Sequence, residues 1–473
     1  MKALSPGTII DGFEIGPRIH SGAMAQIYRV EYAKGPEGHR QQSEFPLIMK
    51  IPRMSTQDGS ETIVSFEVEQ QILPTLGGTF VPRFVASGSL QDTPFLVMEY
   101  LQGKTVQEIL DSQSTALAPS KIAELGTAIS HAIQSLHSQN VCHLDLKPAN
   151  IMIKPNGTAV LFDFGLSCHA HYPDLLAEEM RKAVGSPAWI APEQVVGTRG
   201  DPRSDLFALG VILYELATRE LPFGIPQSDN GLKNRLWMDP KPPRQLNSAV
   251  PPWLQEVILR CLEPEAENRY PSAAHIALDL SHPEQIALTA RAERVEGTGF
   301  KTHFLRWIKA AGKHYVPSPL PASLQILETP IVMVAVPHKD VTPQTLTLLR
   351  EAARRSLGLR KQARLTCVTV VAPSAASLTD AKKSATSLQR QHLHRLQEWA
   401  KPLVSELEPS QHVTYHVLES GDVAEALLLY ARSNHVGLLI MGAATHGLKL
   451  QNFVSTIPVK VAMHAPCTLI LVK

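Results

Sequence analysis

The sequence of 473 residues has few cysteines and no long apolar run. Its five cysteines, Cys142, Cys168, Cys261, Cys367 and Cys467, are odd in number and form no CxxC pair. This pattern argues against a disulfide framework and favours a reducing compartment. No stretch approaches the ~20 apolar residues that cross a bilayer, and the start MKALSPGTIIDG lacks the apolar core of a signal peptide. We expect a cytoplasmic protein with no membrane partner.

An excess of charge of one sign is also missing. The 45 basic and 44 acidic residues leave a net charge of +1, so nothing in the overall charge suggests binding to nucleic acid. The hydrophobic content of 44% is that of a globular protein. The length predicts two or three domains.

Residues 1–282 change from a strand pattern to a helical one. In the first ~100 residues, short apolar runs separated by turns predict an antiparallel sheet. The runs are FEIGPRI, AQIYRVEYA, FPLIMKIPR, FVASGSL and PFLVMEYL, and a predicted helix over 61–76 interrupts them. Helical periodicity follows over 121–139 and 205–218. The pattern predicts an α+β domain with a small β-rich lobe and a larger helical lobe.

The remainder has two parts. Residues 283–327 contain the amphipathic stretch THFLRWIKAAGKHY and the proline-rich VPSPLPAS, which predict a linker with one helix. Over 328–473, buried apolar runs such as IVMVAV and RLTCVTVV alternate with amphipathic helices. This alternation predicts a doubly wound α/β domain with a parallel sheet.

Two short segments carry most of the chemistry, HLDLKPAN at 143–150 and LFDFG at 161–165. Phosphoryl transfer requires a carboxylate near the incoming hydroxyl, cations on the phosphates and oxygen ligands for Mg²⁺. Asp145, Lys147, Asn150 and Asp163 offer such a set.

These segments resemble the H-R-D-L-x-x-x-N and D-F-G signatures of the eukaryotic-type protein kinase superfamily, and the resemblance covers about residues 12–280. It implies that Asp145 accepts the proton of the substrate hydroxyl and that Lys147 lies near the γ-phosphate. It also implies that Asn150 and Asp163 hold Mg²⁺ or Mn²⁺. The form DLKPAN favours serine/threonine over tyrosine specificity.

The same resemblance assigns an ATP site. Lys50 of LIMK is expected to bind the α- and β-phosphates and to pair with a glutamate of the next helix. Glu69 is preferred to Glu67, because Ile72, Leu73 and Leu76 share its helix face. Further residues expected to contact the nucleotide are the gatekeeper Met98, the hinge residues Glu99 and Leu101, the adenine-contacting Ile48 and Met152, and Ile19, Gly22 and Ile27 of the loop over the phosphates.

That loop departs from the family pattern. His20 and Ala25 stand where glycines are usual, so that only Gly22 remains. Glycine lets the backbone approach phosphates closely. We therefore expect weakened nucleotide affinity without its loss.

The activation segment departs in a different way. Leu144 replaces the arginine that grips a phosphorylated loop in many kinases, so we expect activity that does not depend on loop phosphate. Ser167 and Ser186 remain as acceptors, with Ser186 favoured for shaping the substrate site. The resemblance also pairs Glu193 with Arg269 and makes Asp205 the brace of the catalytic loop.

Residues 328–473 resemble the universal stress protein family through IVMVAVPHKD and the ending MHAPCTLILVK. Many members bind ATP through an aspartate after the first strand and a glycine-rich loop. Here Pro337 replaces the aspartate, and only Gly442 remains of the glycines, with Thr445 and Ser455 near the other positions. We favour a domain without nucleotide, and retained binding of ATP or another ligand stays open. The family also self-associates through the edge of its last strand, which implies a homodimer.

The combination resembles bacterial proteins that join a kinase to a stress domain. It predicts a signalling serine/threonine kinase that uses Mg-ATP, acts on protein substrates including itself, and has a regulatory or sensing C-terminal domain. A pseudokinase scaffold that binds nucleotide is the alternative. A third hypothesis makes the C-terminal domain the principal nucleotide sensor, and Pro337 argues against it.

Overall fold

A computed structural model gives the fold. It describes residues 4–22, 24–35, 39, 41–53, 60–89, 93–179, 185–296, 322, 326, 330–339, 341–358, 362–373, 381–407, 412–443 and 456–473. The chain divides into two units, Met1–Ser323 and Leu324–Lys473.

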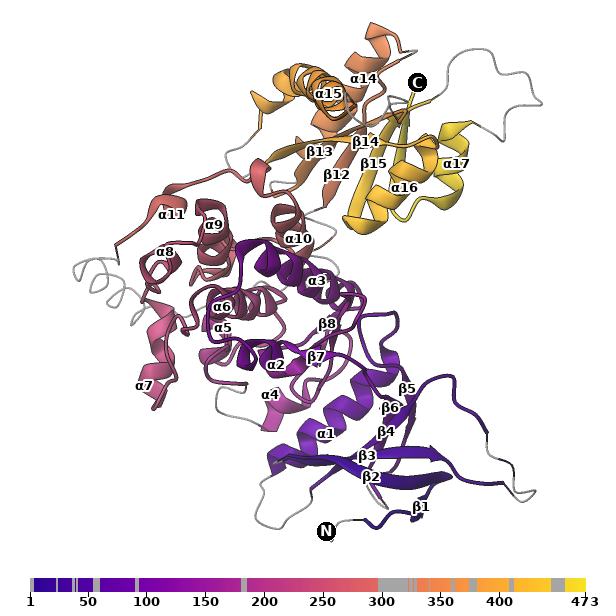
Figure 1. Cartoon of the computed structure of the whole chain (residues 1–473), viewed down its shortest axis with the longest axis vertical. Helices are drawn as coiled ribbons and strands as arrows, with labels where there is room; N and C mark the ends of the chain where they lie inside the picture. The colour runs from indigo at the N-terminus through magenta and orange to yellow at the C-terminus, as the bar shows by residue number, and fades with distance from the viewer. Residues whose placement is uncertain are drawn as a thin grey trace. The chain divides into compact units, whose positions relative to one another are not determined.

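The first unit begins with an antiparallel sheet in the order β1-β2-β3-β4-β6-β5. Its strands are β1 (Ile9–Ile10), β2 (Phe13–Ser21), β3 (Ala25–Tyr32), β4 (Leu47–Pro52), β5 (Phe84–Ser87) and β6 (Leu96–Glu99). Alternate residues such as Ile15, Val30 and Met49 form a core on one face of this sheet. Helix α1 (Ser60–Ile72) lies beside it (Figure 1), and a 3-10 turn, Leu73–Thr75, continues the helix.

The larger lobe of the first unit is helical. Its helices are α2 (Val106–Asp111), α3 (Pro119–Ser138), α4 (Leu175–Glu179), α5 (Pro192–Val195), α6 (Arg203–Thr218), α7 (Asp229–Leu232), α8 (Pro243–Leu246), α9 (Pro252–Cys261), α10 (Ala273–Ser281) and α11 (Ala290–Glu293). Helix α3 packs on both α6 and α10. Gly126 permits this, because a Cβ there would lie 2.6 Å from Leu280 and 2.9 Å from Leu213.

Two small sheets carry the chemistry-bearing segments of this lobe. One has the order β10-β9-β7 and the other pairs β11 with β8. The strands are β7 (Lys104–Thr105), β8 (Val141–Cys142), β9 (Ile151–Ile153), β10 (Ala159–Leu161) and β11 (Cys168–His169). Residues 143–150 therefore leave β8 and enter β9, so that both of their ends are fixed by strand pairing.

The second unit is a parallel five-stranded sheet in the order β14-β13-β12-β15-β16. The strands are β12 (Ile331–Ala335), β13 (Arg364–Val371), β14 (Val413–Glu419), β15 (Val436–Gly442) and β16 (Thr468–Val472). One face packs on α14 (Pro343–Gly358) and α15 (Ala381–Val404). Helices α16 (Val423–Ser433) and α17 (Ile457–His464) pack on each other and lie on the opposite side (Figure 1).

The predicted fold classes are confirmed for both regions. The sequence analysis missed α17, which is a short helix, and the strands of the two small sheets. It also assigned residues 283–296 to the linker, whereas the structure packs them on the first unit. There the Gln255 side-chain amide donates to the backbone carbonyls of Arg291 and Arg294, at 2.7 and 2.8 Å. The predicted linker helix at 302–315 lies outside the described residues.

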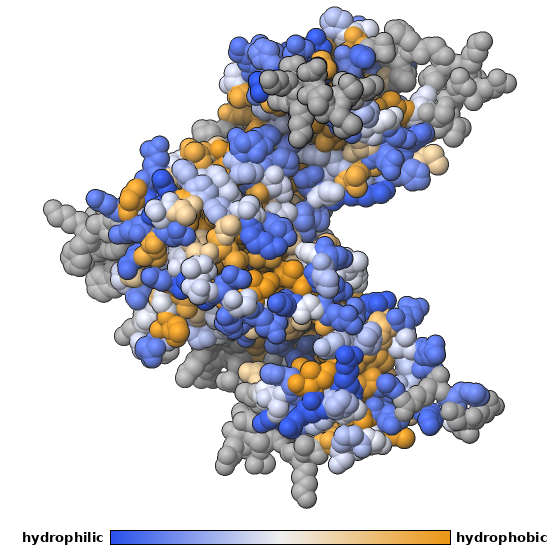
Figure 2. All heavy atoms as spheres, viewed as in Figure 1, coloured by the Kyte–Doolittle hydropathy of each residue, from blue (hydrophilic) through white to orange (hydrophobic). Residues whose placement is uncertain are grey.

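Hydrophilic side chains cover most of the face seen in Figure 2, with apolar ones interspersed. Within the part of the chain that is described, no helix has the length and apolar character needed to cross a membrane.

Candidate functional site

A cavity of about 690 Å³ opens in the first unit beside the open face of the antiparallel sheet. All of the residues predicted to contact nucleotide or metal line it, together with the departing loop residues His20 and Ala25: Ile19, Gly22, Ile27, Ile48, Lys50, Glu69, Met98, Glu99, Leu101, Asn150, Met152 and Asp163. Its walls are mostly apolar, and three of its charged side chains, Lys50, Glu69 and Asp163, form a cluster that we call its charged end. Such an arrangement suits a ligand with an apolar ring and an anionic tail.

At the charged end Lys50 bridges two carboxylates. Its Nζ lies 2.6 Å from Glu69 Oε2 and 2.8 Å from Asp163 Oδ1. Glu69 comes from the buried face of α1, which also carries Phe66 and Ile72, whereas Glu67 lies on a less buried face. The order of apolar residues along α1 thus determines which glutamate reaches the lysine.

Lys50 and Asp163 hold each other in their charged forms. Burial lowers the pKa of Lys50, but the carboxylates of Asp163 and Glu69 outweigh it and the pKa lies above its ordinary value. The positive charge of Lys50 in turn lowers the pKa of Asp163. For Glu69 burial has the largest effect, and it raises the pKa of the carboxyl group despite the neighbouring lysine.

The loop after β8 holds Asp145 between three donors. The Ser186 N–H donates to Oδ1 at 2.7 Å, while Lys147 Nζ and Asn150 Nδ2 donate to Oδ2 at 2.9 and 3.2 Å. Lys147 also donates to the Ser186 hydroxyl at 3.0 Å. The carboxylate is therefore fixed in orientation, with only 7% of the residue exposed.

Buried Asp205 braces this loop. It accepts the backbone N–H groups of His143 and Leu144, both at 2.8 Å, and pairs with His137 Nε2 at 2.8 Å. Leu144 and Asp163 both have positive φ, 62° and 69°. Such strain costs free energy in non-glycine residues and persists only where the surroundings over-determine it.

Comparison with known proteins agrees with this geometry. The family model of the protein kinase domain matches residues 25–280, more than half of the chain. The chain belongs to the protein kinase family. A second model, the universal stress protein family, matches residues 331–473. The family implies ATP and a divalent metal cation at the site.

Three curated relatives of the kinase domain come from bacteria. Serine/threonine-protein kinase Pkn1 of Myxococcus xanthus is 31% identical over 62% of this chain and 41% of its own length. PknB of Mycolicibacterium smegmatis is 28% identical over 58% and 43%, and a probable serine/threonine-protein kinase of Clostridium perfringens is 26% identical over 57% and 38%. The chain thus spans less than half the length of these relatives.

Several residues that the sequence analysis missed hold the kinase domain's activation segment. Fully buried Arg235 donates to the backbone carbonyls of Ile190 and Pro187, and burial lowers its pKa to about 10. Gln194 donates to the Leu144 carbonyl at 2.9 Å. Bonds from side chain to backbone leave no periodic signal in sequence, so neither residue could be found by pattern.

A third missed residue, Arg199, lies against the start of the same segment. Its Nε lies 2.8 Å from Asp174 Oδ2, and its Nη2 donates to the Leu166 carbonyl at 2.8 Å. Asp174 also accepts the Ala177 N–H in α4. Arg199 thus ties the residues just after Asp163 to α4.

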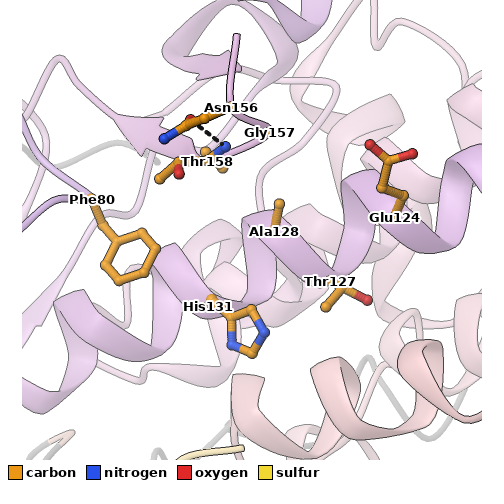
Figure 3. Close-up of a pocket in the computed structure, with 9 residues that line it drawn as sticks. Phe80, Glu124, Thr127, Ala128, His131, Asn156, Gly157 and Thr158 are labelled. Atoms are coloured by element: carbon orange, nitrogen blue, oxygen red, sulfur yellow. Dashed lines mark hydrogen bonds between the residues drawn. The ribbon is translucent and has the colours of Figure 1, made fainter. Parts of the chain in front are cut away.

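The kinase domain has a second hollow of about 360 Å³, between α3 and the turn that joins β9 to β10 (Figure 3). Phe80 lies at one side, Ala128 and His131 project from α3, and Asn156 accepts the Thr158 N–H at 3.0 Å in the turn. Its lining holds one carboxylate and no lysine or arginine. It therefore lacks the charge set of the larger cavity.

Among the described residues that directly follow β12 and β15 in the stress-family domain, none is acidic. Pro337 follows β12, as the sequence shows, and Gly442 ends β15. Thr445 and Ser455 lie outside the described residues. Near Pro337, the rings of His338 and His392 lie 5.1 Å apart, and burial lowers the pKa of both.

Proposed function

We propose that this chain transfers the γ-phosphoryl group of ATP to serine and threonine hydroxyls of proteins, including its own. The observation that carries the proposal is the cluster of Lys50, Glu69 and Asp163 in the cavity. Asn150 lines the same cavity and donates to Asp145, the carboxylate that three donors fix. The relatives of the kinase domain are named serine/threonine-protein kinases, which supports the same activity.

The apolar part of the cavity suits an adenine ring. Ile48 and Met152 both line it and would contact opposite faces of the ring. The Leu101 N–H has no acceptor among the described residues, which leaves it available to an adenine nitrogen. Met98 lies on β6, three residues before Leu101, where its side chain would limit the depth of the pocket.

The anionic tail would meet Lys50, with Ile19, Gly22 and Ile27 covering it. Because Lys50 is held by two carboxylates, it stays charged and is positioned before any phosphate arrives. A side chain fixed in advance loses little entropy on binding.

Asn150 and Asp163 fit a divalent cation. The Asn150 amide nitrogen donates to the Asp145 carbonyl at 3.0 Å, so its amide oxygen remains for a metal. Asp163 is 43% exposed in its side chain and lines the cavity, and only one of its oxygens is bonded to Lys50. We propose Mg²⁺, which prefers such hard oxygens. When bound, the cation would neutralise charge on the transferring phosphoryl group.

Asp145 would orient the substrate hydroxyl and take its proton at a carboxylate oxygen. The three donors on this carboxylate hold it in place, and Lys147 can turn from it to a transferring phosphoryl group without leaving the site. The contact from Lys147 to Ser186 links this loop to the segment that would bind the acceptor peptide.

We also propose that this activity does not depend on phosphate in the activation segment. Leu144 is buried, and Ser167, one of the two acceptors considered, is 1% exposed and donates to the His143 carbonyl. Arg199 and Asp174 supply an ion pair in the place of a loop phosphate. Phosphatase treatment should leave turnover unchanged, and a many-fold loss would contradict the proposal.

For the second unit we propose a sensing, regulatory or dimerising role. One edge of β16 pairs with β15, and among the described residues no strand pairs with its other edge. A second copy could therefore add to that edge. Sedimentation equilibrium of the full chain should show a dimer, and a monomer at every concentration would rule out that part of the role.

The test of the main proposal is an assay of the purified full chain with Mg-ATP and a generic basic protein. Asp145→Asn and Asp163→Asn preserve side-chain size, and each should lower turnover by about 10²–10⁴-fold. The phosphorylated residues should be serine and threonine. Wild-type activity no higher than that of the variants, on the acceptor and on the chain itself, would favour the scaffold alternative.

A further inference from the structure

Two cysteines of the first unit face each other across the small sheet that joins the two catalytic segments. Cys142 on β8 and Cys168 on β11 are directly paired in the antiparallel register. Cys142 is followed immediately by His143, and Cys168 comes five residues after Asp163. Neither thiol has a part in the proposed phosphoryl transfer.

The strand pairing brings the Cα atoms of these residues within the range that disulfides span. The Ala170 N–H donates to the Asn140 carbonyl at 2.9 Å. Since hydrogen-bonded pairs alternate along an antiparallel ladder, Cys142 and Cys168 also form a hydrogen-bonded pair. The Cα atoms of such a pair lie about 5.5 Å apart, inside the range of roughly 4.4–6.8 Å for disulfides.

The surroundings distinguish the two thiols. Cys142 is 3% exposed and packs with Leu144 and Ala322, and its Sγ donates to the Gly200 carbonyl at 3.6 Å. The hydrogen bond with Cys168 and burial raise the pKa of the Cys142 thiol well above its ordinary value. Cys168 is half-buried, so solvent reaches it.

We propose that Cys142 and Cys168 form a reversible disulfide when the protein meets a peroxide, and that this bridge lowers turnover. The Cys168 thiol loses its proton and the thiolate sulfur attacks one peroxide oxygen, so that the S–O bond forms as the O–O bond breaks and Cys168 becomes a sulfenic acid. The leaving hydroxide or alkoxide takes up the proton that the thiol lost and departs as water or an alcohol. The Cys142 thiol then condenses with the sulfenic acid, forming the S–S bond and releasing water. The two thiols together lose two electrons, which reduce the peroxide.

The bridge acts on the geometry of the site. Cβ atoms of directly paired residues lie about 4.5–5.5 Å apart, whereas a disulfide holds them at about 3.8 Å. Oxidation therefore draws β8 and β11 together and shifts the segments that carry Asp145 and Asp163. Displacements of about 1 Å at reacting groups can cost about 10²-fold in rate. A bridge under such strain is readily reduced by other thiols.

The effect on turnover rests on the proposed kinase activity, but the bridge itself does not. The experiment treats the full chain with hydrogen peroxide, blocks the remaining thiols with iodoacetamide and digests it without reductant. Mass spectrometry should find the peptides of Cys142 and Cys168 joined, with the loss of two hydrogens. Turnover should fall at least five-fold and return with dithiothreitol.

Three variants complete the test. Cys142→Ser and Cys168→Ser should keep the turnover of reduced wild type and lose its sensitivity to peroxide. Cys467→Ser, which removes the half-buried cysteine of the second unit, should remain sensitive. If a serine variant fails to fold, the joined peptide from wild type still shows whether the bridge forms, and the recovery of wild-type turnover with dithiothreitol still tests its effect on activity.

Absence of that joined peptide would overturn the site. A joined peptide with unchanged turnover would overturn the control of activity. A reduced wild type without kinase activity would refute the proposed function and leave the peptide measurement valid.

Discussion

The ion pairs of the two units differ in burial. In the first unit Arg269 and Glu193 meet at 2.7 Å with both side chains fully buried, and Lys50 meets Glu69 with exposures of 17% and 3%. In the second unit Lys460 and Asp422 meet at 3.5 Å with about half of each side chain exposed. The remaining pairs described there are at least 40% exposed on both sides.

This difference separates structural and catalytic charge from surface charge. A buried charge must be paired, because leaving it alone costs several kcal/mol. An exposed pair contributes at most about 1 kcal/mol. The first unit has therefore placed charges where their loss should matter, while the described pairs of the second unit should tolerate substitution.

The largest effect on stability should come from Arg269→Met. The change leaves the Glu193 carboxylate buried without its cation, with the Ser204 hydroxyl donating to it at 2.7 Å. We expect the first unit to lose about 3–5 kcal/mol of unfolding free energy, measured by urea denaturation. Lys460→Met is the matched control and should leave the free energy of unfolding nearly unchanged, because its ion pair with Asp422 is exposed. Equal losses in the two variants would remove the distinction between the units.

The next largest effect should come from Lys50→Met, and it should be an effect on turnover instead of stability. The variant removes the cation that the phosphates would meet, and it leaves Glu69 and Asp163 facing each other without compensation. We expect phosphorylation to fall by about 10²–10³-fold, measured with labelled ATP.

Lys121→Met is the control for that change, because Lys121 forms an exposed pair with Glu124 at 2.7 Å. Its turnover should equal that of wild type. A Lys50 variant that kept most of its activity would show that the buried triad is structural only.

The predictability of this site from sequence follows the same division. Lys50, Asp145, Asn150 and Asp163 sit in fixed motifs, and the apolar face of α1 identified Glu69. Hydrogen bonds from side chain to backbone were not predictable. Arg199 and Arg235 donate to backbone carbonyls, and because every residue has such a carbonyl, the sequence does not reveal which one is the acceptor. The fold was read correctly from alternation of strand and helix. What escaped were short elements such as α17, whose eight residues span only about two turns.

The number of ATP molecules bound per chain tests whether the two units also differ in nucleotide binding. The first unit presents Lys50 and Asp163 to its cavity, whereas Pro337 follows β12 in the second unit. Equilibrium dialysis of the full chain with Mg-ATP should therefore give one site, and Lys50→Met should weaken it. A second site that survives in Lys50→Met would place nucleotide in the stress-family domain.

The smallest effect should come from His20→Gly, in the loop over the phosphates. A Cβ on Gly22 would lie 3.2 Å from His20 Nε2, so the imidazole lies close to the one glycine of this loop. Replacing it frees the space and restores a permissive residue.

The KM for ATP of His20→Gly should fall by about two- to five-fold, equivalent to the roughly 0.5–1 kcal/mol that glycine changes typically involve. His20→Ala separates the two causes: an equal gain would assign the effect to the imidazole, and a gain confined to glycine would assign it to backbone freedom. An unchanged KM in both would mean that the charged end of the cavity alone sets the affinity, and the departure of this loop from the family pattern would then carry no cost.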